Sequence, residues 1–161
     1  MRLATGLRRR GGFSFVEILA SAAILGLLAS VAVPVVQTTV KRQKERELRI
    51  ALREIRQAID AYKEASLANR ISTLNEPSGY PATLHDLAVG VEELPSKRRI
   101  YFLRRIPRDP FYPDAAVSAV DTWGKRSFAS PPDRPSEGDD VFDVYTTSAL
   151  TGLNGVPYAE W

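Results

Sequence analysis

The sequence predicts an α+β fold, in which one long N-terminal helix precedes a smaller mixed part with a small antiparallel sheet. Three observations support this. Phe13 to Val36 is an apolar stretch of 24 residues in which Glu17 is the only charged residue. Lys41 to Ala68 contains no Gly or Pro, and its apolar residues recur every three or four positions. The remaining sequence alternates short β-prone segments with loops rich in Pro and Gly.

The apolar stretch is long enough to cross a membrane. As a helix its 24 residues rise about 36 Å, against about 30 Å for a hydrocarbon core. Arg8, Arg9 and Arg10 directly precede it. By the positive-inside rule these arginines place the N-terminus in the cytoplasm and the rest of the chain outside the inner membrane.

The distribution of charge and the absence of cysteine exclude several classes of function. Four of the 22 Lys and Arg residues lie in the first twelve positions, and the other 18 are balanced by 19 Asp and Glu. We therefore expect no nucleic-acid partner. Without cysteine there is no disulfide framework, and zinc–thiolate and iron–sulfur chemistry are excluded. No phosphate-binding loop motif or set of catalytic residues is found, so the sequence does not predict an enzyme.

The second half of the long helix has one apolar face, which we expect to pack against the chain's own domain rather than against lipid or in a coiled coil. That face consists of Leu48, Ala51, Leu52, Ile55, Ala58, Ile59, Tyr62 and Ala65. Glu45 and Arg49 form a favourable i,i+4 pair. Pro34 either kinks or locally unwinds the helix, or ends the membrane segment.

The shorter elements follow from local signals. Thr83 with Asp86 predicts a capped helix that ends near Val89 and is closed by Gly90. The β-prone segments predict the strands. They are Arg99–Ile106, Lys125–Ser130 and Val141–Thr146. Residues 131–138 form a proline-rich loop, and residues 150–161 form a compact, turn-rich tail.

The apolar stretch has two ordinary explanations. A secretory signal peptide would be cleaved after Ser30-Val31-Ala32, but Glu17 would cost about 2.5–3.5 kcal/mol at the centre of its apolar region. A plain membrane anchor accounts for the length and the arginines but leaves Glu17 and the Gly11-Gly12 pair unexplained.

A third hypothesis accounts for all of these residues. The segment Gly12-Phe13-Ser14-Phe15-Val16-Glu17 resembles the processing site of type IV prepilins and type II secretion pseudopilins. Their pattern is a short basic leader, Gly, Phe, Glu as the fifth residue after the cut, and an apolar helix with a Pro near its end, here Pro34. The resemblance implies that a prepilin peptidase cuts after Gly12 and methylates the amino group of Phe13. It also implies that the Glu17 carboxylate pairs with that amine in a neighbouring subunit during assembly.

Later motifs extend the resemblance over nearly the whole mature chain. They follow in the order seen in the major pseudopilin of type II secretion. They are Gly79-Tyr80-Pro81, Ile106-Pro107-Arg108-Asp109-Pro110, Trp123-Gly124-Lys125 and Asp140-Val141-Phe142-Asp143-Val144. In this chain the insertion FYPDAAVSAVDT separates Asp109-Pro110 from Trp123-Gly124. The resemblance implies the pilin fold, a long helix packed on a small antiparallel sheet.

The resulting organisation has three parts. Residues 1–12 are a cleaved leader, residues 13–36 a transmembrane and filament-core helix, and residues 37–161 a periplasmic globular domain that includes the amphipathic half of the helix. We expect a single-pass protein of the bacterial inner membrane that enters a pseudopilus on assembly.

A calcium site is one interpretation of the acids near the last predicted strand, and a solvated loop is the other. Those acids are Asp139, Asp140 and Asp143. Major pseudopilins bind calcium in the loop after that strand, but here Thr147–Glu160 holds a single acid, Glu160. The lone His85 has no His or Cys partner and is expected at the surface.

Aromatic and basic residues alternate in the middle of the chain, which could indicate a nucleic-acid surface. We expect core aromatics beside solvated arginines instead. The aromatics are Tyr101, Phe102, Phe111 and Tyr112, and the arginines are Arg98, Arg99, Arg104 and Arg105.

The predicted function is that of a structural subunit of a type II secretion pseudopilus. Its partners are further copies of itself, the prepilin peptidase, the inner-membrane assembly platform and other pseudopilins. The alternatives are a type IV pilin for adhesion, motility or DNA uptake, and a Sec-exported soluble binding protein.

Overall fold

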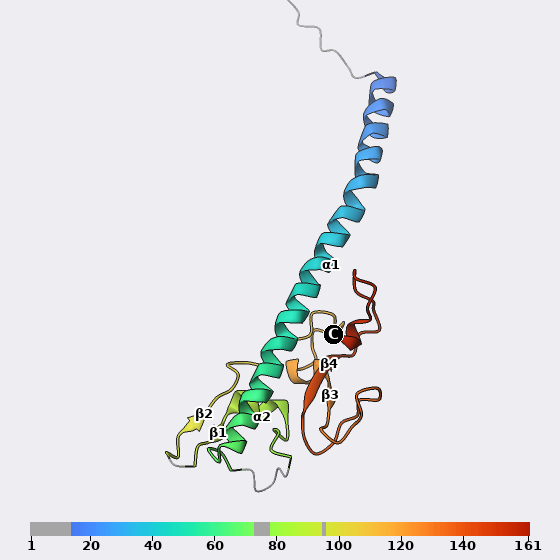
Figure 1. Ribbon diagram of the computed structural model, residues 1–161. Helices are drawn as coiled ribbons and strands as arrows, with labels where there is room; N and C mark the ends of the chain where they lie inside the picture. The colour runs from blue at the N-terminus through green and yellow to red at the C-terminus, as the bar shows by residue number, and fades with distance from the viewer. Residues whose placement is uncertain (1–13, 73–77, 95) are drawn as a thin grey trace, which may run out of the picture. The chain divides into compact units, whose positions relative to one another are not determined.

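The computed structural model describes residues 14–72, 78–94 and 96–161. The chain divides into two compact units, Met1–Val40 and Lys41–Trp161. Helix α1 (Phe15–Leu67) begins in the first unit and ends in the second (Figure 1). The fold is α+β, as predicted, with this long helix, a short helix and two small antiparallel sheets.

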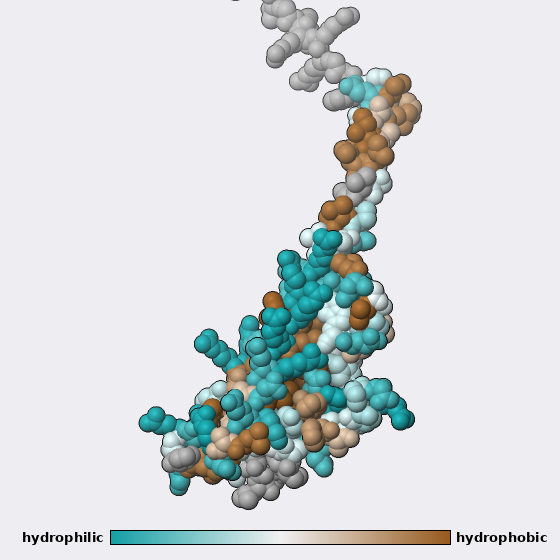
Figure 2. Space-filling model, in the orientation of Figure 1, coloured by the Kyte–Doolittle hydropathy of each residue, from teal (hydrophilic) through white to brown (hydrophobic). Residues whose placement is uncertain are grey.

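In the first unit, α1 carries an apolar surface that is exposed and packs against none of the described residues of that unit. By length and composition alone, it is a helix that could cross a membrane. Phe15, Leu25 and Leu27 are among its exposed side chains. Figure 2 shows hydrophobic side chains along this part of the helix. The sequence supplies apolar residues on every side of this part of the helix, so no face is left to pack against a soluble domain.

Helix α1 neither ends nor unwinds at Pro34, because the backbone stays helical without interruption to Leu67. The helix is therefore not locally unwound at Pro34 in this structure. Where the membrane segment ends stays a prediction. Close to the proline, two threonine hydroxyls donate hydrogen bonds to backbone carbonyls of the preceding helical turn. Thr38 Oγ1 donates to the Pro34 carbonyl at 2.8 Å, and Thr39 Oγ1 donates to the Val35 carbonyl at 2.9 Å.

In the second unit, α1 buries one face in the hydrophobic core. All eight residues of the predicted apolar face are buried, and the lipid-surface and coiled-coil hypotheses for that face are wrong. The other members of the core come from the rest of this unit. They include Leu84, Leu87, Leu103, Trp123, Val141, Val144 and Tyr158.

Helix α2 (Leu84–Val89) has the predicted ends. The backbone N–H and the hydroxyl of Thr83 both donate to the Asp86 carboxylate at 2.8 Å. Gly90 ends the helix with a φ of 81°. A Cβ there would lie 2.5 Å from the Ile100 carbonyl oxygen, so both the backbone angle and the lack of space require glycine.

The strands form two separate two-stranded antiparallel sheets. In one, β1 (Val91–Glu92) pairs with β2 (Arg99–Ile100). In the other, β3 (Trp123–Arg126) pairs with β4 (Asp143–Thr146), and Trp123 lies opposite Thr146. Val144 and Thr146 are buried while Asp143 and Tyr145 are half-buried, which is the predicted alternation.

All three strand predictions are wrong in extent. The predicted strand Val141–Thr146 begins two residues later, at Asp143. The predicted strand Arg99–Ile106 stops at Ile100, because the backbone N–H groups of Phe102 and Leu103 both donate to the Leu87 carbonyl at the end of α2. The predicted strand Lys125–Ser130 begins earlier and ends at Arg126. Beyond it, Ser127 N–H donates to the Ser136 carbonyl across the loop instead of to β4.

Asp109 ties three segments of the second unit together, and its side chain is only 1% exposed. Its carboxylate accepts from the Phe111 N–H at 2.8 Å and from the Thr146 hydroxyl on β4. Its own N–H donates to Thr122 Oγ1 at 3.2 Å, at the end of the 3₁₀ helix η1 (Ala119–Thr122). The segment before the sequence insertion is thus joined both to the last residue of the insertion, Thr122, and to β4.

We expect Asp109→Ala to lower the free energy of unfolding by about 2–3 kcal/mol, because it leaves buried donors without an acceptor. Urea unfolding of the full chain in detergent micelles, followed by Trp fluorescence, measures this change. Both tryptophans, Trp123 and Trp161, lie in the second unit. Asp139→Ala is the matched control, since Asp139 is exposed. Equal stability of the two variants would contradict the role of Asp109.

Candidate functional site

Glu17 lies in the first turn of α1 and is exposed. It shares a strip of the helix surface with Ile18, Ser21, Ala22 and Leu25. Within the described residues, its carboxylate makes no hydrogen bond or ion pair. An acid in the first turn suits the positive end of the helix dipole, but in a membrane it still needs a cationic partner.

The other predicted residues of this site are Gly12, Phe13 and Pro34. Gly12 and Phe13 lie outside the described residues. Pro34 is well down the same helix. Within the first unit, the described part of the site is therefore an apolar helix with one exposed carboxylate near its start.

A second candidate site lies where the C-terminal segment, residues 150–161, packs on α1 in the second unit. Lys41 Nζ donates to the Thr151 carbonyl at 2.8 Å. The segment folds back through a bridge between Thr151 and Pro157 and ends in the 3₁₀ helix η2 (Tyr158–Glu160). Figure 1 shows the C-terminus beside this part of α1, as the contacts require.

Glu45 anchors this segment from inside the core, where it is 5% exposed. Its Oε1 accepts from the Leu153 N–H at 2.7 Å and from the Tyr158 hydroxyl at 2.8 Å. Burial, together with the hydrogen bond to Glu45 and its negative charge, raises the pKa of Tyr158 to about 12.

The predicted i,i+4 pair of Glu45 with Arg49 is wrong. The Arg49 guanidinium instead lies over the Trp161 ring, with its Cζ 4.3 Å from the ring centroid. The helix-pair rule considers only neighbours on the same helix, and so it missed the tertiary role of Glu45. The spacing could have indicated that Glu45 is buried, since Glu45 is three residues before Leu48 and lies on the apolar face.

Arg56 joins α1 to β4 and to the end of the C-terminal segment. Its Nε donates to Asp143 Oδ1 at 2.8 Å, its Nη2 to the Val144 carbonyl at 3.2 Å, and its Nη1 to the main-chain oxygen of Trp161 at 2.9 Å. A groove of about 450 Å³ lies beside these contacts. It is lined by Arg49, Leu52, Arg53, Arg56, Gln57, Asp60, Asn154 and Trp161.

The three acids of the calcium hypothesis do not converge. Burial raises the pKa of Asp140, but hydrogen bonds from Ser78, Phe128 and Ser127 lower it by more. The pKa of Asp140 therefore lies below its usual value. Asp143 pairs with Arg56, and Asp139 is exposed. Across residues 14–72, 78–94 and 96–161, no group of three or more His, Asp or Glu side chains could hold a metal ion. Calcium binding stays a prediction.

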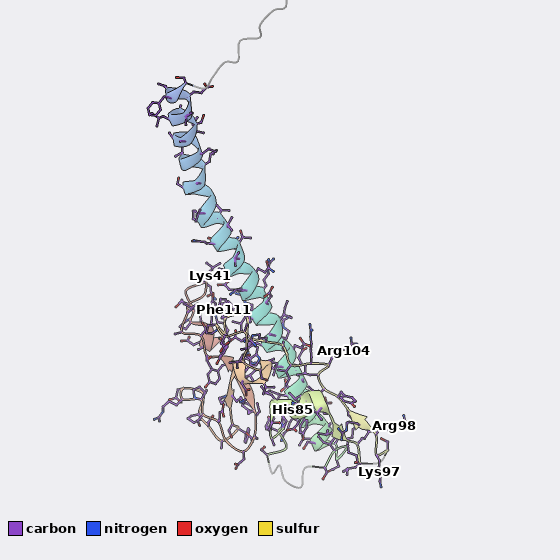
Figure 3. All side chains as sticks on the ribbon, turned by 180° about the vertical axis from the view of Figure 1, so that it is seen from behind. Lys41, His85, Lys97, Arg98, Arg104 and Phe111 are labelled. Carbon is purple, nitrogen blue, oxygen red and sulfur yellow. The ribbon has the colours of Figure 1, made fainter. Side chains whose placement is uncertain are left out.

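The remaining surface predictions have mixed outcomes. His85 is exposed on α2, as predicted (Figure 3). Phe102 and Phe111 pack against the core, but Tyr101 is 62% exposed, so its assignment to the core is wrong. Its side chain lies just beyond β2, where the chain turns towards α2. Arg98, Arg99, Arg104 and Arg105 are exposed, as predicted.

Comparison with known protein families gives a match at the N-terminus. Residues 7–33 match the family model described as the prokaryotic N-terminal methylation motif. The matched stretch contains Gly12, Phe13 and Glu17. It supports a type IV pilin-like, prepilin-type protein. Neither the comparison with curated proteins nor the comparison with solved structures found a match.

We expect Tyr158 to titrate at about pH 12 and Glu45→Ala to bring that value closer to the ordinary 10.0. The folded state binds this proton more tightly than the unfolded state, so the free energy of unfolding falls as the pH rises from about 10 to about 12. That fall should be smaller in the variant.

Ultraviolet absorbance of tyrosinate measures the titration, and subtraction of the Tyr158→Phe curve isolates this residue. Glu47→Ala is the control, because Glu47 is exposed on the same helix. An unchanged Tyr158 titration in Glu45→Ala would show that the carboxylate does not act on it.

Proposed function

We propose that this chain is a structural subunit of a filament of the type IV pilin class. A prepilin peptidase cuts it after Gly12 and methylates the new amino group of Phe13. The observation that carries the proposal is the match of residues 7–33 to the prokaryotic N-terminal methylation motif. It is supported by the exposed apolar helix that follows and by the small α+β unit at the end of that helix.

Assembly gives the exposed apolar helix and Glu17 a role. Apolar helices that have no partner within one chain can pack together in the core of a filament. In that core the Glu17 carboxylate pairs with the Phe13 amine of a neighbouring copy, because opposite charges attract strongly where water is excluded. Pro34 gives the helix a weak point, because its nitrogen has no hydrogen to donate.

Among such filaments we favour the type II secretion pseudopilus. The order of short motifs from Gly79 to Val144 resembles that of the major pseudopilin, and the chain has no cysteine, whereas many type IV pilins close a C-terminal loop with a disulfide. The subunit would be anchored once in the bacterial inner membrane, with its second unit in the periplasm. It would act with the assembly platform and other pseudopilins in protein export, and not as an enzyme.

Processing is tested by sequencing the N-terminus of the chain isolated from a host that has a prepilin peptidase. We expect it to begin at Phe13 and to carry one added methyl group. Gly12→Asp should leave the leader attached, because an acidic side chain blocks the close approach of the peptidase to the backbone. Gly11→Ala should be cut normally and is the control. A chain that begins at Val33 would instead indicate a secretory signal peptide, and an intact N-terminus would indicate a plain anchor.

Glu17→Gln keeps the size of the side chain but removes its charge. We expect this variant to be processed but not assembled, so that exported proteins accumulate in the periplasm of a strain that depends on it. Ser21→Ala, on the same strip of α1, should assemble and support export. Immunoblots of sheared filaments and of secreted proteins measure both effects. Normal assembly of Glu17→Gln would refute the charge pairing, and loss of motility or DNA uptake with intact export would favour a pilus.

A further inference from the structure

The groove on α1 in the second unit presents positive charge without protein partners. Arg49 and Arg53 lie one helical turn apart and are both exposed. In the part of the chain that the structure describes, neither makes a hydrogen bond or ion pair, and the Arg49 guanidinium lies over the Trp161 ring. Arg56 is different, since all three of its nitrogens have partners.

The groove is shaped as well as charged. Leu52 is buried at its base, and Trp161 forms a wall that is held by its contacts with Tyr158, Arg49 and Arg56. Asn154 adds a free amide N–H₂, because its Oδ1 already accepts from Val156 N–H. Figure 2 shows hydrophilic side chains gathered along α1 in this unit. Hydrogen-bond donors placed above an apolar floor are suited to bind a peptide segment that carries carboxylates.

The same unit carries such a segment in the loop of residues 131–139. It has the sequence Pro-Pro-Asp-Arg-Pro-Ser-Glu-Gly-Asp, with three acids, one base and three prolines. Asp133, Glu137 and Asp139 are exposed. Asp133 and Glu137 have only long ion pairs, at 4.0 and 3.5 Å, and Asp139 has none among the described residues.

The ends of this loop are held in place. Ser127 N–H donates to the Ser136 carbonyl at 2.9 Å, and Asp140 accepts from the Ser127 hydroxyl and the Phe128 N–H. Together with the prolines, these bonds reduce the conformational entropy that the loop would lose on binding. None of the residues that line the groove comes from the loop, so the loop does not fill the groove of its own chain.

We propose that the α1 groove of one subunit binds the acidic loop, residues 131–139, of a second copy, with Arg49 and Arg53 facing the carboxylates of the loop. The charges are complementary, with two unpaired arginines on one surface and an excess of two acids on the other. Asp60, which also lines the groove, repels a carboxylate beside it. This repulsion directs the carboxylates of the loop towards Arg49 and Arg53.

This contact joins two different surfaces, so each bound copy still offers a free groove or a free loop. Such head-to-tail contacts propagate into open helical assemblies when the rotation does not close a ring. The inference rests on the proposed function, which it deepens by naming a contact between subunits outside the apolar helices.

Cysteine cross-linking tests the contact, because the chain has no cysteine of its own. Gln57→Cys places a thiol in the groove and Ser136→Cys places one on the loop, and both leave the charged residues intact. In full-length chain assembled in membranes, the double variant should give a ladder of multimers on oxidation. Two single variants expressed together should give dimers only. Cross-linked dimers of Gln57→Cys alone would overturn the proposal, because the groove would then face itself.

Reversing the charge of groove and loop residues is a second test of the contact. In the double-cysteine background, Arg53→Glu should lower the cross-linked product by about fivefold, and Asp139→Lys added to it should restore the product. Arg46→Glu, exposed on α1 outside the groove, is the matched control and should have no effect. Filaments that form without the ladder would overturn this inference and leave the proposed function standing. Loss of both ladder and filaments in the processed chain would overturn both.

Discussion

The apolar face that α1 buries in the second unit is the interaction on which the rest of that unit depends. It runs from Leu48 to Ala65 and contributes eight of the sixteen buried hydrophobic residues that form the core among the described residues. The sheets are too small to provide a core themselves, since one has two-residue strands and the other four-residue strands. Strand pairs of this size are marginal in isolation, so both sheets need the surface that the helix offers.

Polar contacts then decide how the loops lie on that surface. Glu45 and Arg56 hold the C-terminal segment, and Asp109 holds the segment before η1. Each of these side chains makes at least two hydrogen bonds, and for the buried Glu45 and Asp109 these bonds offset the cost of burial. In the proposed contact between copies, the same C-terminal segment supplies one wall of the groove that receives the neighbour.

The first unit has the opposite arrangement, with an apolar helix that has no core to enter. Its exposed apolar side chains would be unfavourable in water, and the Glu17 carboxylate without a partner would be unfavourable in lipid. A membrane covers the apolar surface, and a filament core both covers that surface and offers Glu17 a partner of opposite charge. For this reason we place the function in assembly. The second unit would then add specificity through charged surfaces that the apolar helices lack.

The sequence by itself determined the long helix, its buried face, the capped helix α2 and the N-terminal motif, because each depends on residues close together in the chain. It predicted the end of strand β4 but began that strand two residues too early, and it extended β2 too far, because the bonds of Phe102 and Leu103 to Leu87 are tertiary. It also paired Glu45 with Arg49, whereas the true partners of Glu45 are more than a hundred residues away. Only the tertiary structure could decide these contacts, since local spacing carries no information on which distant segment returns to the helix.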